Sequence, residues 1–278
     1  MLVDAISGID TQSNVILLCD DRSSNGCIVS INGITYVIST GHGVLLREDE
    51  NSPIRLRGSL EIKRYDGTPI TWTKLLYESR EPSDKGYYDR ILIEVLLPAE
   101  LKPLQLSLTP SLNMKLTNVA SIAGSKTLVS GRVVTMTDHE AYIPAFTPSG
   151  ASGLGLLDAN GAVAGVIRAT SDQHEGIDIP EGNYSVKAVG MMFMRALDDA
   201  RHEPIYTVLI LSQEFSSILT SPSRKEILPS DEFPGDSDNR KRARGQSSPD
   251  NDTPRAKGRQ ARWVSGISGA MRNTQPIE

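Results

Sequence analysis

The sequence contains little cysteine and no long apolar run. Cys19 and Cys27 are the only cysteines among 278 residues, and two buried thiols are favoured over a bond between them. No stretch of 18 apolar residues occurs, so we expect no transmembrane helix and no membrane partner. The first residues lack a charged leader followed by a long apolar stretch. We therefore expect no secretory signal and an intracellular location, in the cytoplasm or the nucleus.

Charge is distributed unevenly along the chain. Residues 240–278 hold nine Lys and Arg against three Asp and Glu, a balance of +6, whereas the remaining residues hold 20 against 31, a balance of −11. Residues 222–278 lack an apolar pattern and are rich in Pro, Ser, Asp, Arg and Gly, so we expect a disordered basic tail. Its cations, beside Trp263, could bind RNA or a nuclear-import receptor; a purely solubilising tail is the alternative.

Short alternating apolar runs, separated by turn residues, predict an all-β body. Hairpins are expected at Asn32-Gly33, Asp66-Gly67 and Asn160-Gly161, the first two with type I′ turns. Residues 98–110 hold three prolines and are interpreted as a surface linker.

The pattern changes near the end of the body, over residues 207–220. There, four apolar residues recur with the period of a helix: Leu211, Phe215, Ile218 and Leu219. We expect a helix in this segment and the end of the folded part at Ser221.

Three short motifs hold a histidine, an acid and a serine. His42 lies in Ser39-Thr-Gly-His-Gly43, which closes an apolar hairpin, and Asp89 directly precedes the apolar strand expected at 91–97. Ser152 lies in Thr147-Pro-Ser-Gly-Ala-Ser-Gly153, ahead of another apolar hairpin. The intervals are 46 residues between His42 and Asp89 and 62 between Asp89 and Ser152.

In its motifs and their order, the chain resembles the chymotrypsin-like serine proteases. The pattern Thr-x-x-Gly-x-Ser-Gly is most similar to the serine proteases of positive-strand RNA viruses, such as the sobemovirus-like ones. The resemblance implies an all-β fold of two six-stranded antiparallel β-barrels and a closing C-terminal helix. The first barrel is expected over residues 1–97, the linker over 98–110, and the second barrel with the helix over 111–221.

The resemblance also implies a chemistry. Ser152 would attack the scissile carbonyl of a polypeptide substrate, His42 would take its proton, and Asp89 would orient the imidazole. The backbone N–H groups of Gly150 and Ser152 would bind the oxyanion. This mechanism uses no cofactor and no metal.

Other residues compete for these roles. Asp84 and Asp66 are the alternative acids, but Asp89 is favoured because it directly precedes the apolar strand, although Arg90 stands where an aliphatic residue is usual. The remaining histidines are expected to be solvated: His139, His174 and His202.

The chain departs from secreted trypsins around the serine. Ala151 replaces the aspartate that pairs with a newly cut N-terminal amine, so no activation cleavage is expected. Leu154 and Gly155 also differ from the trypsin pattern, and Gly43 stands where the disulfide partner of Cys27 would lie.

Three residues are candidates for the substrate pocket. Thr147 matches the threonine of viral relatives that cut after Glu, whereas Ile167 stands where those relatives place a histidine. Arg168 could meet an acidic side chain, or it could be an ordinary exposed strand residue. Phe146 replaces the pocket-floor aspartate of trypsins, so cleavage after Lys or Arg is not expected.

Two other functions remain open. One is a cellular protease of the high-temperature-requirement type, although the 57 residues after Ser221 show no strand pattern for a complete PDZ domain. The other is a non-catalytic protease-fold scaffold with a nucleic-acid-binding tail. A chain ending at Ser221 is expected to keep any peptidase activity.

Overall fold

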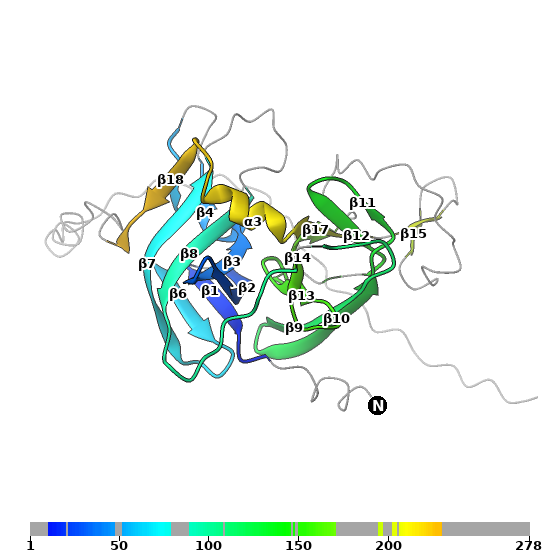
Figure 1. The fold of residues 1–278 in the computed structure, drawn as a ribbon, viewed down its shortest axis with the longest axis horizontal. Coiled ribbons are helices and arrows are strands. Elements are labelled where there is room, and N and C mark those ends of the chain that lie inside the picture. Colours follow the sequence, from blue (N-terminus) through cyan, green and yellow to red (C-terminus); the bar gives the residue numbers. More distant parts are fainter. Residues whose placement is uncertain are drawn as a thin grey trace, which may run out of the picture. The chain divides into compact units, whose positions relative to one another are not determined.

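Two antiparallel β-sheets make up most of the structure (Figure 1), a computed structural model. It describes residues 11–20, 22–47, 52–78, 89–107, 109–145, 147, 150–170, 194–196, 202–204 and 206–229. Phe146, Asp84 and His174, and the tail from residue 230 onward, lie outside the described residues. No helix among the described residues is long and apolar enough to cross a membrane.

The first sheet closes into a six-stranded barrel. Its strands are β1 (Asn14–Cys19), β2 (Arg22–Ile31), β3 (Ile34–Thr40), β6 (Leu60–Arg64), β7 (Pro69–Glu78) and β8 (Arg90–Leu96). They follow the order β7-β6-β1-β2-β3-β8, and β8 pairs back onto β7. A seventh strand, β18 (Arg224–Ile227), joins the sheet at β7.

The second sheet closes through a bend in the chain. Its order is β10 (Ser125–Arg132), β9 (Lys115–Ile122), β13 (Gly155–Leu157), β14 (Val163–Thr170), β17 (Thr207–Leu211), β12 (Glu140–Ile143) and β11 (Thr135–Met136). Only Val133 and Val134 separate β10 from β11. The Val133 N–H donates to Met114 O beside β9, and the Val134 N–H donates to Tyr142 O on β12. The outer strands are therefore two halves of one bent segment, which explains seven strands where six were expected.

Smaller elements complete the described residues. Two short strand pairs are β4 (Leu45–Leu46) with β5 (Arg55–Leu56), and β15 (Met194–Ala196) with β16 (His202–Pro204). The described helices are the 3-10 turn η1 (Gly41–Gly43) and α3 (Gln213–Ile218). The expected linker, 98–110, makes backbone hydrogen bonds to both sheets, from Leu104 to β2 and from Ser107 to β14.

The hairpin turns agree with expectation in one case and differ in another. Asn32 and Gly33 both have positive φ, 53° and 79°, as a type I′ turn requires. In the second hairpin only Gly67 has positive φ, 88°, and the Arg64 N–H donates to Thr68 O. The turn is thus one residue longer than predicted, and the extra residue, Tyr65, reaches the boundary between the sheets.

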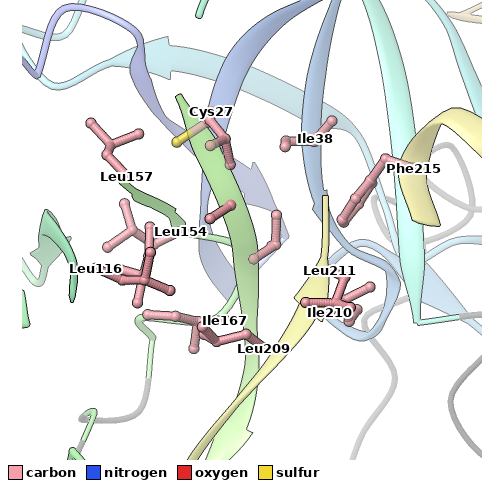
Figure 2. Packing of buried hydrophobic residues seen from close by; sticks show 14 of the residues in the cluster. Cys27, Ile38, Leu116, Leu154, Leu157, Ile167, Leu209, Ile210, Leu211 and Phe215 are labelled. Atoms are coloured by element: carbon pink, nitrogen blue, oxygen red, sulfur yellow. The ribbon is translucent and has the colours of Figure 1, made fainter. Parts of the chain in front are cut away.

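The apolar faces of β2 and β3 explain how the sheets pack. Ile28 and Val37 point into the first barrel, whereas Cys27, Val29 and Ile38 belong to a cluster with the second sheet. Figure 2 draws Cys27 and Ile38 with Leu154, Leu211 and Phe215, which belong to the same buried cluster. Both faces of these strands are buried in their middle parts, which accounts for the uninterrupted apolar residues at 27–29 of β2 and 36–38 of β3.

The C-terminal part of the body differs from the sequence-based prediction. Residues 207–211 form β17 rather than helix, because they lie between β12 and β14 and are buried on both faces. The helix α3 is only 213–218, and it contacts β7 and β8 of the first barrel as well as β17. The predicted boundary at Ser221 is wrong, because β18 follows it and pairs with β7.

Both cysteines are buried free thiols, as favoured above. Burial raises the pKa of the Cys27 thiol to about 12, so it stays protonated at any physiological pH. We predict that the native protein reacts with a thiol reagent far more slowly than the unfolded chain, which should titrate two thiols. The melting temperature should be the same with and without reductant; a drop on reduction would contradict the free-thiol assignment.

Candidate active site

The ends of two neighbouring strands bring His42 and Asp89 together. Thr40, the last residue of β3, pairs with Arg90, the first residue of β8. His42 and Asp89 therefore leave the same edge of the barrel, and the Gly41 N–H donates to Asp89 O at 2.9 Å.

The carboxylate of Asp89 holds both the backbone and the ring of His42. The His42 N–H donates to Asp89 Oδ1 at 3.0 Å, and His42 Nδ1 lies 2.8 Å from Oδ1 and 3.1 Å from Oδ2. With Nδ1 as the donor, Nε2 is left as a base. Asp66, one of the alternative acids, instead accepts the Thr68 N–H within its own hairpin turn.

Ser152 occupies a tight turn whose geometry fixes one backbone N–H. The Leu154 N–H donates to Ala151 O at 3.2 Å, and Gly153 has φ 87°. Because C=O and N–H point in opposite directions across a trans peptide, the Ser152 N–H points away from the turn's own hydrogen bond. It is thus available to an incoming oxygen, as expected for an oxyanion donor. Gly150, the other expected donor, has φ 94°.

Both the backbone angle and the space available require a glycine at position 153. A Cβ there would lie 1.9 Å from Asn25 O and 2.2 Å from Ser39 Oγ. The nucleophile turn is therefore packed directly against β2 and β3 of the first barrel.

Adjacent residues of β2 touch both loops of the site. The Asn25 N–H donates to Ser152 O at 2.8 Å, and the Ser24 side chain lies 2.7 Å from where a Cβ on Gly43 would stand. His42 and Ser152 thus approach the same short stretch of strand from the two sheets.

The side chain of Ser152 is turned toward the second barrel. Its Oγ donates to Arg168 O at 3.3 Å, and it makes no hydrogen bond with the His42 ring, although both residues are described. Rotation about one side-chain bond changes the direction of this hydroxyl without moving the backbone.

Asn25 is a residue that the sequence analysis missed. Its Nδ2 donates to Gly150 O at 2.6 Å and to Ser121 O at 3.2 Å. Its Oδ1 accepts the Tyr65 hydroxyl and the Ser121 N–H. Burial raises the pKa of Tyr65, which keeps that hydroxyl a donor. Asn25 lies in the polar run Arg22-Ser-Ser-Asn-Gly26 that opens β2, so no local pattern distinguished it.

The expected pocket residues have partners within the protein. Thr147, 3% exposed, places its hydroxyl 3.1 Å from that of Thr207. Arg168 lies at a bulge between β14 and β17, with Nε 3.2 Å from a Glu140 oxygen. The exposed-strand interpretation of Arg168 is wrong, because its side chain is only 18% exposed.

The side chain of His139 is half exposed, as expected, and its Nδ1 lies 3.1 Å from a Glu214 oxygen. The described residues contain no group of three or more His, Cys, Asp or Glu that could hold a metal ion.

Comparison with protein-family models and with curated proteins finds no match. Among solved structures, a Glu endopeptidase in complex with MPD matches with a TM-score of 0.51 and 16% identity, over 76% of this chain and 89% of that one. Inactive Rv3671c from M. tuberculosis H37Rv matches with a TM-score of 0.45 and 17% identity, over 79% and 88%. A serine endoprotease from Yersinia pestis gives 0.45 and 14%, over 62% and 59%. The Glu endopeptidase match confirms the two-barrel, chymotrypsin-like fold.

Asn25→Ala should destabilise the protein. The substitution removes four partly buried hydrogen bonds, each worth about 0.5–1.5 kcal/mol, so a loss of at least about 2 kcal/mol in the free energy of unfolding is expected. Urea unfolding measures it. Asn160→Ala, at an exposed hairpin turn, is the matched control and should stay within about 0.5 kcal/mol of wild type. Equal effects of the two substitutions would refute the role assigned to Asn25.

Proposed function

We propose that the protein is a serine endopeptidase that cleaves polypeptides through Ser152, His42 and Asp89. The observation that carries the proposal is the His42–Asp89 pair at one edge of the first barrel, with the Ser152 turn bonded to β2 beside it. The chymotrypsin-like fold supports it, because this arrangement of loops is where such a fold holds its nucleophile.

The geometry allows each step of acyl transfer. The Ser152 hydroxyl, once turned from Arg168 O toward His42, gives its proton to Nε2 as Oγ attacks the substrate carbonyl. Asp89, bonded to Nδ1, stabilises the imidazolium that forms. The Ser152 N–H donates a hydrogen bond to the oxyanion as it develops. His42 then gives the proton to the leaving amine. A water molecule then attacks the acyl-enzyme through the same proton transfers, which releases the acyl group and restores Ser152.

The turn needs no ion pair to take its shape. Ala151 is fully buried among apolar residues, and the turn is held by the Leu154 N–H and by Asn25. We propose that the enzyme is active without N-terminal processing, in line with the absent aspartate at position 151.

Ser152→Ala and His42→Ala should each abolish peptide cleavage in a protein that remains folded. Members of a triad act as a unit, so each loss should cost on the order of 10⁶ in kcat, and the double variant little more. Cleavage of a peptide library measures this, with Ser130→Ala, exposed on β10, as the control. Near wild-type turnover by Ser152→Ala would favour the scaffold interpretation or another nucleophile.

The basic tail supports a second proposal, that the segment beyond β18 binds nucleic acid. Residues 240–278, within that segment, carry a balance of +6 against −11 for the rest of the chain. A chain ending at Pro229 keeps β18, so it should retain peptidase activity and lose RNA retention. For the full chain, log K should fall with log[salt] by roughly 0.7 per phosphate contacted on a single strand. Equal RNA binding by the two chains would exclude the tail as the binding segment.

A further inference from the structure

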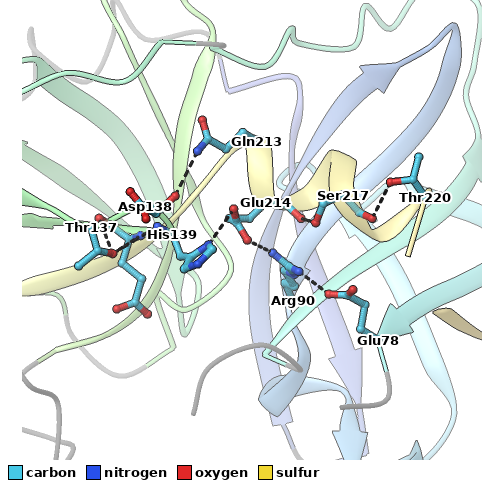
Figure 3. Close-up of polar contacts among 10 residues, drawn as sticks. Glu78, Arg90, Thr137, Asp138, His139, Gln213, Glu214, Ser217 and Thr220 are labelled. Carbon is cyan, nitrogen blue, oxygen red and sulfur yellow. Dashed lines mark hydrogen bonds and ion pairs between the residues drawn. The ribbon is translucent and has the colours of Figure 1, made fainter. Parts of the chain in front are cut away.

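Arg90, the residue after the proposed catalytic acid, belongs to an ion cluster that the proposed mechanism does not use. The guanidinium of Arg90 bonds to Glu78 through one terminal nitrogen and to Glu214 through the other (Figure 3). The Arg90 side chain is 3% exposed, Glu78 is fully buried, and Glu214 is 12% exposed. The second oxygen of Glu214 contacts His139, between β11 and β12 of the second sheet.

We propose that Arg90 is a positioning residue that fixes Asp89 against His42, and that the C-terminal segment 213–227 supports it. The inference rests on the proposed function, because it concerns the geometry of that site. Arg90 itself contacts none of the reacting atoms and acts through Asp89.

The connection from Arg90 to Asp89 is covalent and short. Arg90 is the first residue of β8 and pairs with Thr40, so its place in the sheet sets where Asp89 leaves the strand. Asp89 holds Gly41 and His42 through its carbonyl and carboxylate. A displacement of about 1 Å in such a group can cost about 100-fold in rate. An anchor at residue 90 therefore controls the geometry of the His42–Asp89 pair.

Two elements of the C-terminal segment hold the anchor. Helix α3 supplies Glu214, which binds one side of the guanidinium. Strand β18 pairs Arg224 with Glu78, and thereby fixes the strand end that supplies the other carboxylate. Residues that follow the second barrel in sequence thus complete the support of an acid in the first.

The chemistry of the cluster favours positioning over stability alone. A buried ion pair loses much hydration, and apolar residues of the same size often stabilise a protein equally well. A guanidinium, however, is a planar fork that fixes two carboxylates in direction as well as distance. Here the two carboxylates come from β7 and α3, so the fork defines how these elements sit around β8.

The test compares Arg90→Lys and Glu214→Gln with wild type. Lysine keeps the charge but not the fork, and glutamine keeps the shape but not the charge. Both should lower kcat about 10- to 100-fold and leave KM within about twofold, because the substrate contacts stay intact. Glu94→Gln is the matched control: it removes an ion pair with Lys74 between the same strands, away from Asp89, and should leave kcat unchanged.

The ring N–H of His42 separates positioning from simple loss of stability. In the wild type this proton lies between Nδ1 and Asp89 Oδ1, which are 2.8 Å apart. A displaced carboxylate lengthens that hydrogen bond, so the ring N–H resonance should move upfield and exchange faster with solvent in Arg90→Lys and in Glu214→Gln. NMR of the folded variants measures this change independently of turnover.

Truncation tests the part played by the C-terminal segment. A chain ending at Ser221 should show the same lowered kcat and the same change in the His42 ring N–H resonance as the point variants, whereas one ending at Pro229 should match the full chain. Unchanged kcat and an unchanged ring N–H resonance in Arg90→Lys and Glu214→Gln would overturn the positioning role while leaving the peptidase in place. An inactive wild type would instead overturn the proposed function, and the ring N–H resonance would still decide the role of Arg90.

Discussion

The side-chain amide of Asn25 lies between the two sheets and uses all four of its hydrogen-bonding positions there. Its nitrogen donates to Gly150 O and Ser121 O, and its oxygen accepts from Tyr65 and from the Ser121 N–H. With the Asn25 N–H bonded to Ser152 O, one residue of the first barrel holds both ends of the nucleophile turn. These contacts fix the position of the nucleophile turn relative to the strand that it meets.

Apolar packing alone would not give that precision. The cluster around Cys27 and Phe215 buries area, and its energy depends little on small sliding motions. Buried amides are different, because each lost hydrogen bond leaves a costly unpaired group. Asn14 and Asn118 bond to each other in both directions, and Asn118 also donates to Gly155 O just beyond the turn. These bonds select one arrangement of the sheets.

Local patterns in the sequence were sufficient for the parts of the site that lie at strand ends. His42 and Asp89 come together because the strands before and after them pair in register, and Asn32-Gly33 sets the first hairpin. The contacts of Asn25 with residues about a hundred positions away leave no such local signal, and neither does the bond from Arg90 to Glu214. The run 207–211 was assigned to helix because a short buried strand and a buried helical face share their apolar composition. The strand β18 went unrecognised because three of its four residues are charged, and its pairing with β7 supplies what its side chains do not.

Labelling with an organophosphonate ester tests the central claim most directly, because such a reagent reacts only with a serine activated by a correctly placed base. The native full-length protein is treated, digested, and mapped by mass spectrometry, with His42→Ala and heat-unfolded protein as controls. The account predicts one adduct, on Ser152, in the native wild type and none in either control. An unlabelled native protein, or an adduct on another residue that persists in His42→Ala, would contradict it.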